Sequence, residues 1–285
     1  MAPRYHFISG LPRSGSTLLA AILRQNPRLS AGMTSPVNNL FEAVIAQCSA
    51  GSEMAPLISQ TQRTRLLTAL FDAYHSDQAE GPADRIVFDT NRRWTGRLPA
   101  LIQLFPDAKV LCCVRNVAWV MDSLECRFRE NPFENTRLFN SPAERNSVYS
   151  RVDTLAQRDR LVGAAWSNLK EAMYGEYADR LLIIEYEYLV QRPRQVLELI
   201  YQFLGEPVYE HDFDNVTYEA PAFDSQLGVD GLHAVHPKVE PQTRRTILPP
   251  DLFEKYANDA FWREAASSAA HVIAPTGRPA GAGAS

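Results

Sequence analysis

The segment Phe7–Leu19, FISGLPRSGSTLL, constrains the fold of this chain more than any other segment. An apolar run typical of a buried strand leads into a polar loop bounded by Gly10 and Gly15, and a helical pattern follows. The glycine spacing is that of the phosphate-binding motif G-x-x-x-x-G-K-[ST], except that Ser16 stands in place of the lysine. The segment therefore predicts a strand, an anion-binding loop and a helix, without the lysine of a metal-nucleotide site.

The side chains of this loop also favour an anion. A helix that begins near Gly15 directs unpaired backbone N–H groups and a partial positive charge into the loop. Ser14, Ser16 and Thr17 add hydroxyl donors. Arg13 adds a fixed positive charge that can hold two oxygens at once. The alternative is a capped helix after a tight turn, which would explain the glycines and serines. Such a turn does not require an arginine, so we favour an anion site.

Composition limits the class of protein. With 285 residues, 45% hydrophobic and 22% charged, the chain is typical of a globular α/β protein, and we expect one domain over residues 1–275. The net charge of -4 argues against a general nucleic-acid or membrane-surface binder, so a polyanion site must be local. No leader or membrane-spanning stretch is recognisable, which predicts a cytoplasmic, bacterial-type protein. The tail 276–285 has too few apolar residues to pack, and we expect it to be disordered.

The cysteines show no spacing typical of metal ligands. Two of them lie inside an apolar run, VLCCV. We therefore expect buried thiols in a reducing compartment and no metal site. The cysteines are Cys48, Cys112, Cys113 and Cys126.

Strand and helix patterns alternate along the chain. Apolar runs at Arg85–Phe88, Val110–Val114 and Arg180–Tyr186 are typical of strands buried on both faces. Helical patterns lie between and after these runs, and this order predicts a parallel sheet flanked by helices on both sides. The predicted helices cover residues 40–46, 61–74, 98–105, 117–128, 152–173 and 192–204.

Polar residues after the middle strand predict a second anion-binding group. Arg115 stands at the strand tip, and Ser123 lies two helical turns further on, off the apolar stripe of its helix. Each residue alone is equally well explained, as a surface salt bridge or as a helix-surface hydroxyl. Their joint placement with the first loop favours contacts to one ligand, because strand ends of a parallel sheet meet at one crevice.

These features together resemble the sulfotransferase family that uses 3′-phosphoadenosine 5′-phosphosulfate (PAPS). The resemblance rests on the PRSGST loop, on Arg115 with Ser123 eight residues later, and on a strand that ends in Tyr186–Glu187. It spans roughly residues 5–205. The tyrosylprotein sulfotransferases and their bacterial relatives are most similar, because they share the PRSG sequence and the segment FP-x-x-K, here Phe105–Lys109.

The resemblance implies a sulfotransferase fold with a P-loop-like parallel sheet, PAPS as the donor and its product, adenosine 3′,5′-bisphosphate (PAP). The first loop would hold the 5′-phosphosulfate, and Arg115 with Ser123 would hold the 3′-phosphate. Tyr186 would lie near the reaction centre or simply pack at a strand end, and Lys238 would close over the phosphates. The implied donor-site residues are Arg13, Ser14, Gly15, Ser16, Thr17, Arg115, Ser123, Tyr186 and Lys238.

The acceptor implied by the resemblance is a hydroxyl group, on a peptide tyrosine or on a small molecule. A homodimer is expected by family analogy. A cluster of arginines could attract an acidic peptide around a tyrosine, or could be ordinary solvated side chains. These arginines are Arg92, Arg93, Arg97, Arg127 and Arg129.

The general base is where the chain departs from the tyrosylprotein branch. Thr34–Pro36 stands in the region where that branch has a catalytic glutamate, and Asp89 with its neighbours stands where it has a lysine. Asp89 and His233 are the two candidate bases, with Arg13 as the third catalytic residue. Asp89 could instead anchor Arg92 or Arg93, either of which could replace the lysine charge, and His233 could be a hydrogen-bonded loop histidine.

Two other functions share the same loop. A P-loop nucleotide kinase would need the loop lysine and an acidic magnesium partner, and Ser16 occupies the lysine position. A catalytically inactive nucleotide-binding regulator would keep the donor site and lack the base. Both remain alternatives to a sulfotransferase.

Overall fold

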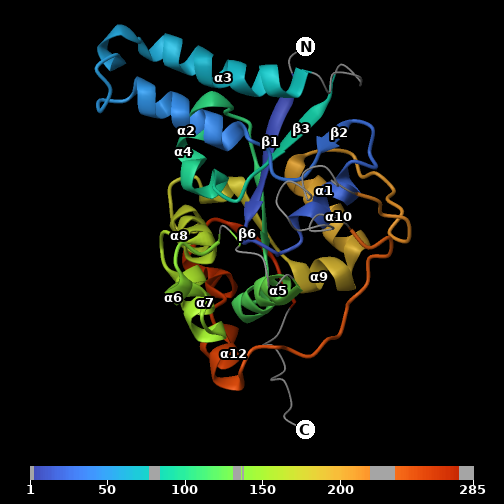
Figure 1. Ribbon diagram of the computed structural model, residues 1–285. Coiled ribbons are helices and arrows are strands. Elements are labelled where there is room, and N and C mark those ends of the chain that lie inside the picture. Colours follow the sequence, from blue (N-terminus) through green and yellow to red (C-terminus); the bar gives the residue numbers. More distant parts are fainter. Residues whose placement is uncertain (1–2, 77–83, 131–135, 137, 219–234, 276–285) are drawn as a thin grey trace.

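The structure is a computed structural model that describes residues 3–76, 84–130, 136, 138–218 and 235–275 (Figure 1). The described residues form one six-stranded sheet in the order β2-β3-β1-β4-β5-β6, and every neighbouring pair is parallel. The predicted α/β fold with a parallel sheet flanked by helices is confirmed. The strands are β1 (Arg4–Gly10), β2 (Leu29–Ala31), β3 (Ile86–Thr90), β4 (Val110–Val114), β5 (Leu181–Glu185) and β6 (His271–Ile273).

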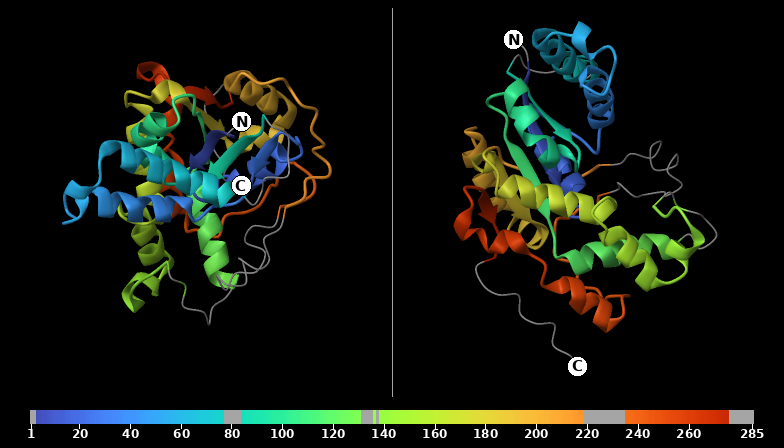
Figure 2. Two further views of the ribbon diagram at one scale, coloured as in Figure 1. Left: turned by 90° about the horizontal axis from the view of Figure 1, so that it is seen from above. Right: turned by 90° about the vertical axis from the view of Figure 1, so that its left-hand side faces the viewer.

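Helices cover both faces of this sheet, and the hairpin of α2 and α3 projects from one end of the molecule (Figure 2). The α-helices are α1 (Ser16–Leu23), α2 (Val37–Cys48), α3 (Gln60–Ser76), α4 (Leu98–Leu104), α5 (Val117–Glu130), α6 (Pro142–Arg145), α7 (Val148–Ala156), α8 (Leu161–Met173), α9 (Tyr186–Gln191), α10 (Pro193–Leu204) and α12 (Pro250–Ala257). Short 3-10 helices are η1 (Ala55–Leu57), η2 (Trp94–Arg97), η3 (Ala178–Arg180), η4 (Phe261–Arg263) and η5 (Ala265–Ser267).

The sheet divides the apolar core into two clusters, because alternate side chains of a strand point to opposite faces. Phe7 of β1 packs in one cluster with α2, α3, α4, α5, α7, α8 and α12. Its neighbour Ile8 packs in the other with α1, α9 and α10. Cys112 and Cys113 divide in the same way and are fully buried free thiols, and burial raises the pKa of Cys113 to about 12. The continuous apolar runs of the sequence thus reflect a sheet covered on both sides.

The free cysteines match the predicted buried thiols in all but one case. Cys48, Cys112 and Cys113 are buried, whereas Cys126 is partly exposed. Among the residues that the structure describes, no group of three or more histidine, cysteine, aspartate and glutamate side chains is placed to hold a metal ion. The described part of the chain also has no helix of the length and apolarity that crossing a bilayer requires.

Several predicted element boundaries are wrong. The helix predicted over 152–173 is two helices, α7 and α8, with a break at 157–160. A Cβ atom on Gly163 would lie 2.2 Å from the carbonyl oxygen of Gln157, so this glycine lets the start of α8 pass close to the end of α7. The edge strands β2 and β6 have three residues each and were not predicted, because so short a run has no visible period.

The helix predicted over 40–46 begins earlier, at Val37, directly after Pro36. In α3, Leu67 and Phe71 are buried, but Leu66 is 49% exposed and does not join the core. The segment between α5 and α7 contains the short helix α6, which Ser141 caps by accepting a hydrogen bond from the Glu144 N–H. The single domain over 1–275 stays a prediction, and the tail 276–285 lies outside the described residues.

Candidate active site

The predicted anion-binding loop lies between the end of β1 and the start of α1. Gly10, Arg13 and Gly15 have left-handed backbone conformations, with φ of 111°, 58° and 91°. A Cβ atom on Gly10 would lie 2.0 Å from the carbonyl oxygen of Cys113, so only glycine fits where the loop leaves the sheet. Among the described residues, no side chain caps the N-terminus of α1, and no acidic residue lies in its first turn. The backbone N–H groups at this helix start are therefore available to an anion.

The three hydroxyl groups of the loop differ in what they contact. The Ser14 hydroxyl is buried and lies 2.5 Å from the carbonyl oxygen of Leu11 and 2.8 Å from that of Cys113. Its proton is used inside the fold, so Ser14 retains only its backbone N–H for a ligand. Ser16 and Thr17 are half-buried, and their hydroxyl groups form no hydrogen bond to any described residue. The predicted role as a hydroxyl donor therefore fits Ser16 and Thr17 better than Ser14.

The two predicted phosphate-binding groups meet in the folded chain. The Nε atom of Arg13, in the first loop, donates a hydrogen bond to the Oγ atom of Ser123 on α5 at 3.2 Å. Burial and the positive charges of Arg127 and Arg115 lower the pKa of Arg13. Positive charge is thus concentrated where the sequence predicts two anionic groups, which is the electrostatic requirement of such a site.

Tyr186 lies between these two groups. A Cβ atom on Gly15 would lie 2.7 Å from a carbon of the Tyr186 ring, so the ring packs directly on the loop. The guanidinium of Arg115 lies over the same ring, 4.4 Å from its centroid. This distance is typical of a cation–π contact. The Tyr186 ring therefore packs between the loop and Arg115, and its role in the donor site stays a prediction.

Glu187 was not predicted as a site residue. The Nε atom of Arg115 donates to its Oε1 atom at 3.2 Å, and both side chains are partly buried. Burial raises the pKa of Glu187, and the positive charge of Arg115 acts in the opposite direction. The sequence offers one signal for this contact, because Glu187 directly follows Tyr186, a predicted site residue. The pairing of β4 with β5, which brings Glu187 beside Arg115, comes only from the structure.

The structure does not support Asp89 as the general base. Its side chain, at the end of β3, is completely buried. Oδ1 accepts hydrogen bonds from the Ser35 hydroxyl and the Trp94 indole, each at 2.8 Å, and Oδ2 lies 3.0 Å from Nε2 of His75. A buried carboxylate with these partners has no access to an acceptor hydroxyl, so Asp89 is an anchor. It anchors Ser35, Trp94 and His75 rather than the arginines next to it.

Two predicted residues near the C-terminal part of the chain gain no support from the geometry. His233, the other candidate base, lies outside the described residues. Lys238 is exposed and pairs with Glu240 at 3.3 Å. None of its described contacts involves the anion-binding loop. The roles of His233 and Lys238 stay predictions.

The five arginines considered for an acidic acceptor divide into two groups. Arg97 pairs with Glu42, and the remaining pairs are Arg127 with Glu130 and Arg129 with Glu125, both at 2.7 Å. In the described parts of the chain, Arg92 and Arg93 have no carboxylate partner, and both are exposed. Partial loss of hydration against neighbouring protein atoms and the positive charge of Arg93 both lower the pKa of Arg92.

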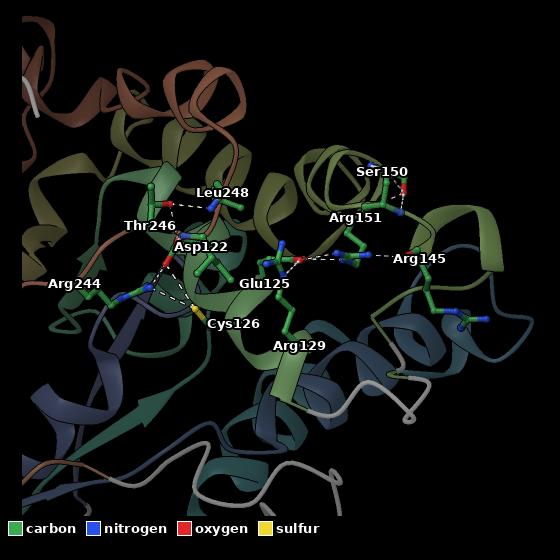
Figure 3. Close-up of polar contacts among 12 residues, drawn as sticks. Asp122, Glu125, Cys126, Arg129, Arg145, Ser150, Arg151, Arg244, Thr246 and Leu248 are labelled. Atoms are coloured by element: carbon green, nitrogen blue, oxygen red, sulfur yellow. Dashed lines mark hydrogen bonds and ion pairs between the residues drawn. The ribbon is translucent and has the colours of Figure 1, made fainter. Parts of the chain in front are cut away.

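Two buried carboxylates fix the helix that carries Ser123, and sequence reasoning missed both (Figure 3). Asp122 accepts hydrogen bonds from the Thr246 hydroxyl at 2.7 Å and the Ile247 N–H at 2.8 Å. It also forms an ion pair with Arg244. Three residues along α5, Glu125 accepts from Nε of Arg151 at 2.8 Å. Helix α5 is therefore held by α7 on one side and by the segment around residue 246 on the other.

The comparison with known proteins identifies the family. The model of the Sulfotransferase family matches residues 6–211. Protein-tyrosine sulfotransferase 2 of Gallus gallus is 26% identical over 206 residues, which cover 70% of this chain and 50% of that protein. Nodulation protein NoeE of Sinorhizobium fredii is 25% identical over 219 residues, which cover 71% of this chain and 50% of that protein. The chain thus spans about half the length of the curated relatives that it matches.

Solved structures agree with this result at the level of the fold. A sulfotransferase from Alicyclobacillus acidocaldarius superposes with a TM-score of 0.50 at 18% identity, covering 81% of this chain and 97% of that one. The predicted resemblance to sulfotransferases, with tyrosylprotein sulfotransferases among the similar proteins, is confirmed. With the family match covering well over half of its residues, this chain belongs to the Sulfotransferase family.

Proposed function

We propose that this chain transfers a sulfuryl group from PAPS to an acceptor hydroxyl and releases PAP. The observation that carries the proposal is the hydrogen bond between Arg13 and Ser123, which joins the two predicted phosphate-binding groups. A donor with phosphate groups at both its 5′ and 3′ positions has the anions that such a paired site requires. Family membership supports the same donor.

The residues present fit this donor chemically. The loop from Gly10 to Gly15 and the start of α1 would hold the 5′-phosphosulfate through backbone N–H groups, with Ser16 and Thr17 as hydroxyl donors. Arg115 and Ser123 would hold the 3′-phosphate. A sulfuryl group carries less charge than a phosphoryl group, so arginine and hydroxyl donors can stabilise the bridging oxygen as the acceptor oxygen attacks in line.

Arg13 is the residue that we propose as a catalytic contact to the donor. Its guanidinium lies in the loop beside the helix start, and its Nε is held by Ser123. Negative charge develops on the bridging oxygen during transfer, and a preorganised cation stabilises that charge more than it stabilises the ground state. The acceptor proton must pass to a base, for which His233 remains the proposed residue.

The kinase alternative is the weaker one. A loop lysine that could reach transferred phosphate is missing, since Ser16 takes its position. The family match favours sulfuryl transfer over phosphoryl transfer. An inactive nucleotide-binding regulator would share the donor site, and turnover distinguishes it from an enzyme.

For the acceptor we propose a tyrosine in an acidic peptide, with a small hydroxyl compound as the alternative. Two relatives are named protein-tyrosine sulfotransferases. Arg92 and Arg93 are exposed and lack a carboxylate partner among the described residues, so they are able to bind acidic side chains. A cytoplasmic location and a homodimer remain proposals that rest on the sequence and the family.

The test combines donor binding with turnover. Calorimetry should show that wild-type protein binds PAP, and that Arg13→Ala and Arg115→Ala weaken this binding at least tenfold. Arg194→Ala is the matched control, because Arg194 pairs with Glu210 on the exposed surface. Unchanged PAP affinity in both site variants would contradict the donor assignment.

Turnover then separates an enzyme from a regulator. PAPS and a peptide with one tyrosine among acidic residues should yield PAP and a sulfated peptide, measured by mass spectrometry. A peptide with phenylalanine at that position is the control. Tight PAP binding without transfer to the tyrosine peptide or to small phenols would favour the regulator.

A further inference from the structure

Arg115 is held on two sides by neighbours from one short segment. Its Nε atom donates to Oε1 of Glu187 at 3.2 Å, and its guanidinium lies 4.4 Å from the centroid of the Tyr186 ring. Within the described ranges, no hydrogen bond involves the two terminal nitrogens of Arg115. The carboxylate of Glu187 thus binds the Nε side of the guanidinium, and the edge formed by Nη1 and Nη2 remains available to a ligand.

The parallel sheet produces this arrangement. Strands β4 and β5 are neighbours, and Val114 pairs with Glu185 at their carboxyl ends. The residues that follow each strand, Arg115 and the start of α9, therefore emerge side by side. Arg115 is 18% exposed and Glu187 is 33% exposed, so the ion pair lies at the surface of the site and is partly shielded from water.

We propose that Glu187 is a positioning residue of the donor site, which holds Arg115 by Nε so that its terminal nitrogens face the 3′-phosphate. This inference rests on the proposed function, because it takes Arg115 as the 3′-phosphate ligand. An unrestrained arginine loses rotamer freedom when it binds an anion, and a side chain that is already held loses less. The two remaining nitrogens form the fork that binds two phosphate oxygens.

The charge of Glu187 opposes this benefit, because a carboxylate repels a phosphate dianion. In the proposed arrangement the positive guanidinium of Arg115 lies between the carboxylate and the 3′-phosphate and reduces this repulsion. If positioning dominates, removal of Glu187 weakens binding of the 3′-phosphate. If repulsion dominates, removal strengthens it. The two effects have opposite signs and are therefore separable by experiment.

The experiment compares two ligands that differ only in the 3′-phosphate, PAP and adenosine 5′-phosphate, by competition calorimetry. Glu187→Ala should weaken the affinity for PAP about tenfold, which is the loss expected for one charge-assisted hydrogen bond. The affinity for adenosine 5′-phosphate should stay within about twofold of wild type. Glu187→Gln keeps an oxygen acceptor for Nε and should stay within about threefold of wild type for PAP. Glu210→Gln, which removes a carboxylate from an exposed pair with Arg194, controls for the change in net charge.

A double-mutant cycle tests whether Glu187 acts through Arg115. In an Arg115→Ala background, Glu187→Ala should cause no further loss of PAP affinity. Tighter PAP binding in Glu187→Ala and Glu187→Gln would overturn the proposal, and so would equal weakening of both ligands. Wild-type protein that binds PAP no more tightly than adenosine 5′-phosphate would instead contradict the proposed donor site itself.

Discussion

Nε of Arg13 lies 3.2 Å from Oγ of Ser123, although 110 residues separate them in the chain. Arg13 stands in the loop after β1, and Ser123 stands on α5, after the neighbouring strand β4. The contact joins the guanidinium of Arg13, from one predicted phosphate-binding group, to the hydroxyl of Ser123, from the other. The two predicted groups are therefore in direct contact in the folded protein, as the proposed donor site requires.

Ser123→Ala tests this contact directly. The variant loses the oxygen that holds Arg13 and the hydroxyl proposed for the 3′-phosphate, so PAP affinity should fall about fivefold to tenfold. Ser123→Thr keeps the hydroxyl and should bind PAP close to wild type. Calorimetry with PAP checks both. Equal PAP affinity in Ser123→Ala and wild type would show that the hydroxyl contributes only to packing.

Gly15→Ala should destabilise the loop and weaken PAP binding. Gly15 has φ of 91°, and its added methyl group would lie 2.7 Å from the Tyr186 ring. Gly205→Ala is the control, because Gly205 has φ of 76° but no atom of the described residues lies within 4 Å of the added methyl. We expect about 1 kcal/mol loss of unfolding free energy from backbone strain in either variant, and a larger loss in Gly15→Ala. If both lose the same stability and keep PAP binding, the Tyr186 contact is unimportant.

Asp89→Asn should reduce stability more than it reduces the rate constant of a folded enzyme. The buried carboxylate accepts from Ser35 and Trp94 and contacts His75. An uncharged amide can keep all three contacts only if the proton of His75 moves to its other ring nitrogen, which is buried and has no partner among the described residues. The expected loss of unfolding free energy is about 3 kcal/mol, against about 1 kcal/mol for Ser35→Ala, which removes one donor. Urea unfolding measures both. An Asp89→Asn protein with wild-type stability and abolished single-turnover transfer would restore Asp89 as the base.

The stability of the fold should fall as the pH falls below about 6.5. Burial lowers the pKa of His6 to about 4, and its neutral Nδ1 accepts a hydrogen bond from the Lys109 N–H at 3.1 Å. Burial also lowers the pKa of His211 to about 4. Between the unfolded value and pH 4 the unfolded chain binds more protons than the folded chain, so acid favours unfolding, by up to about 3 kcal/mol for each histidine.

Urea unfolding at pH 7 and pH 5 checks this expectation. His6→Asn should lose less stability between the two pH values than wild type, because it cannot take up a proton on unfolding. His271→Asn changes an exposed histidine and is the control. Equal pH dependence in wild type and His6→Asn would contradict a role for His6.

Local patterns in the sequence predicted the parts of the site that follow strands. The run Val110–Val114 is apolar because both of its faces are covered, and that property marks where β4 ends and Arg115 begins. The loop before α1 was predicted for a similar reason, because Gly10 and Gly15 are required by backbone conformation and close approach. These features depend on residues near one another in the chain.

Contacts between distant residues could not be predicted in the same way. The environment of Asp89 is decided by His75 of α3, by Ser35 before α2 and by Trp94 of η2, which no spacing brings together. When those partners are not known, a carboxylate at a strand end is readily predicted to be a general base. The break between α7 and α8 likewise depends on the close passage of Gly163 over Gln157.

Backbone preference and burial leave local periodic patterns in a sequence. The alternating strands and helices, the glycine-bounded loop before α1 and the residues at the strand tips could be predicted from such patterns. Which of those side chains are in contact could be read only from the folded chain. The fold joined Arg13 to Ser123, enclosed Asp89 and set Glu187 against Arg115. The physical reason is that side-chain partnership depends on which strands are neighbours in the sheet, and that order is fixed by packing across the whole chain.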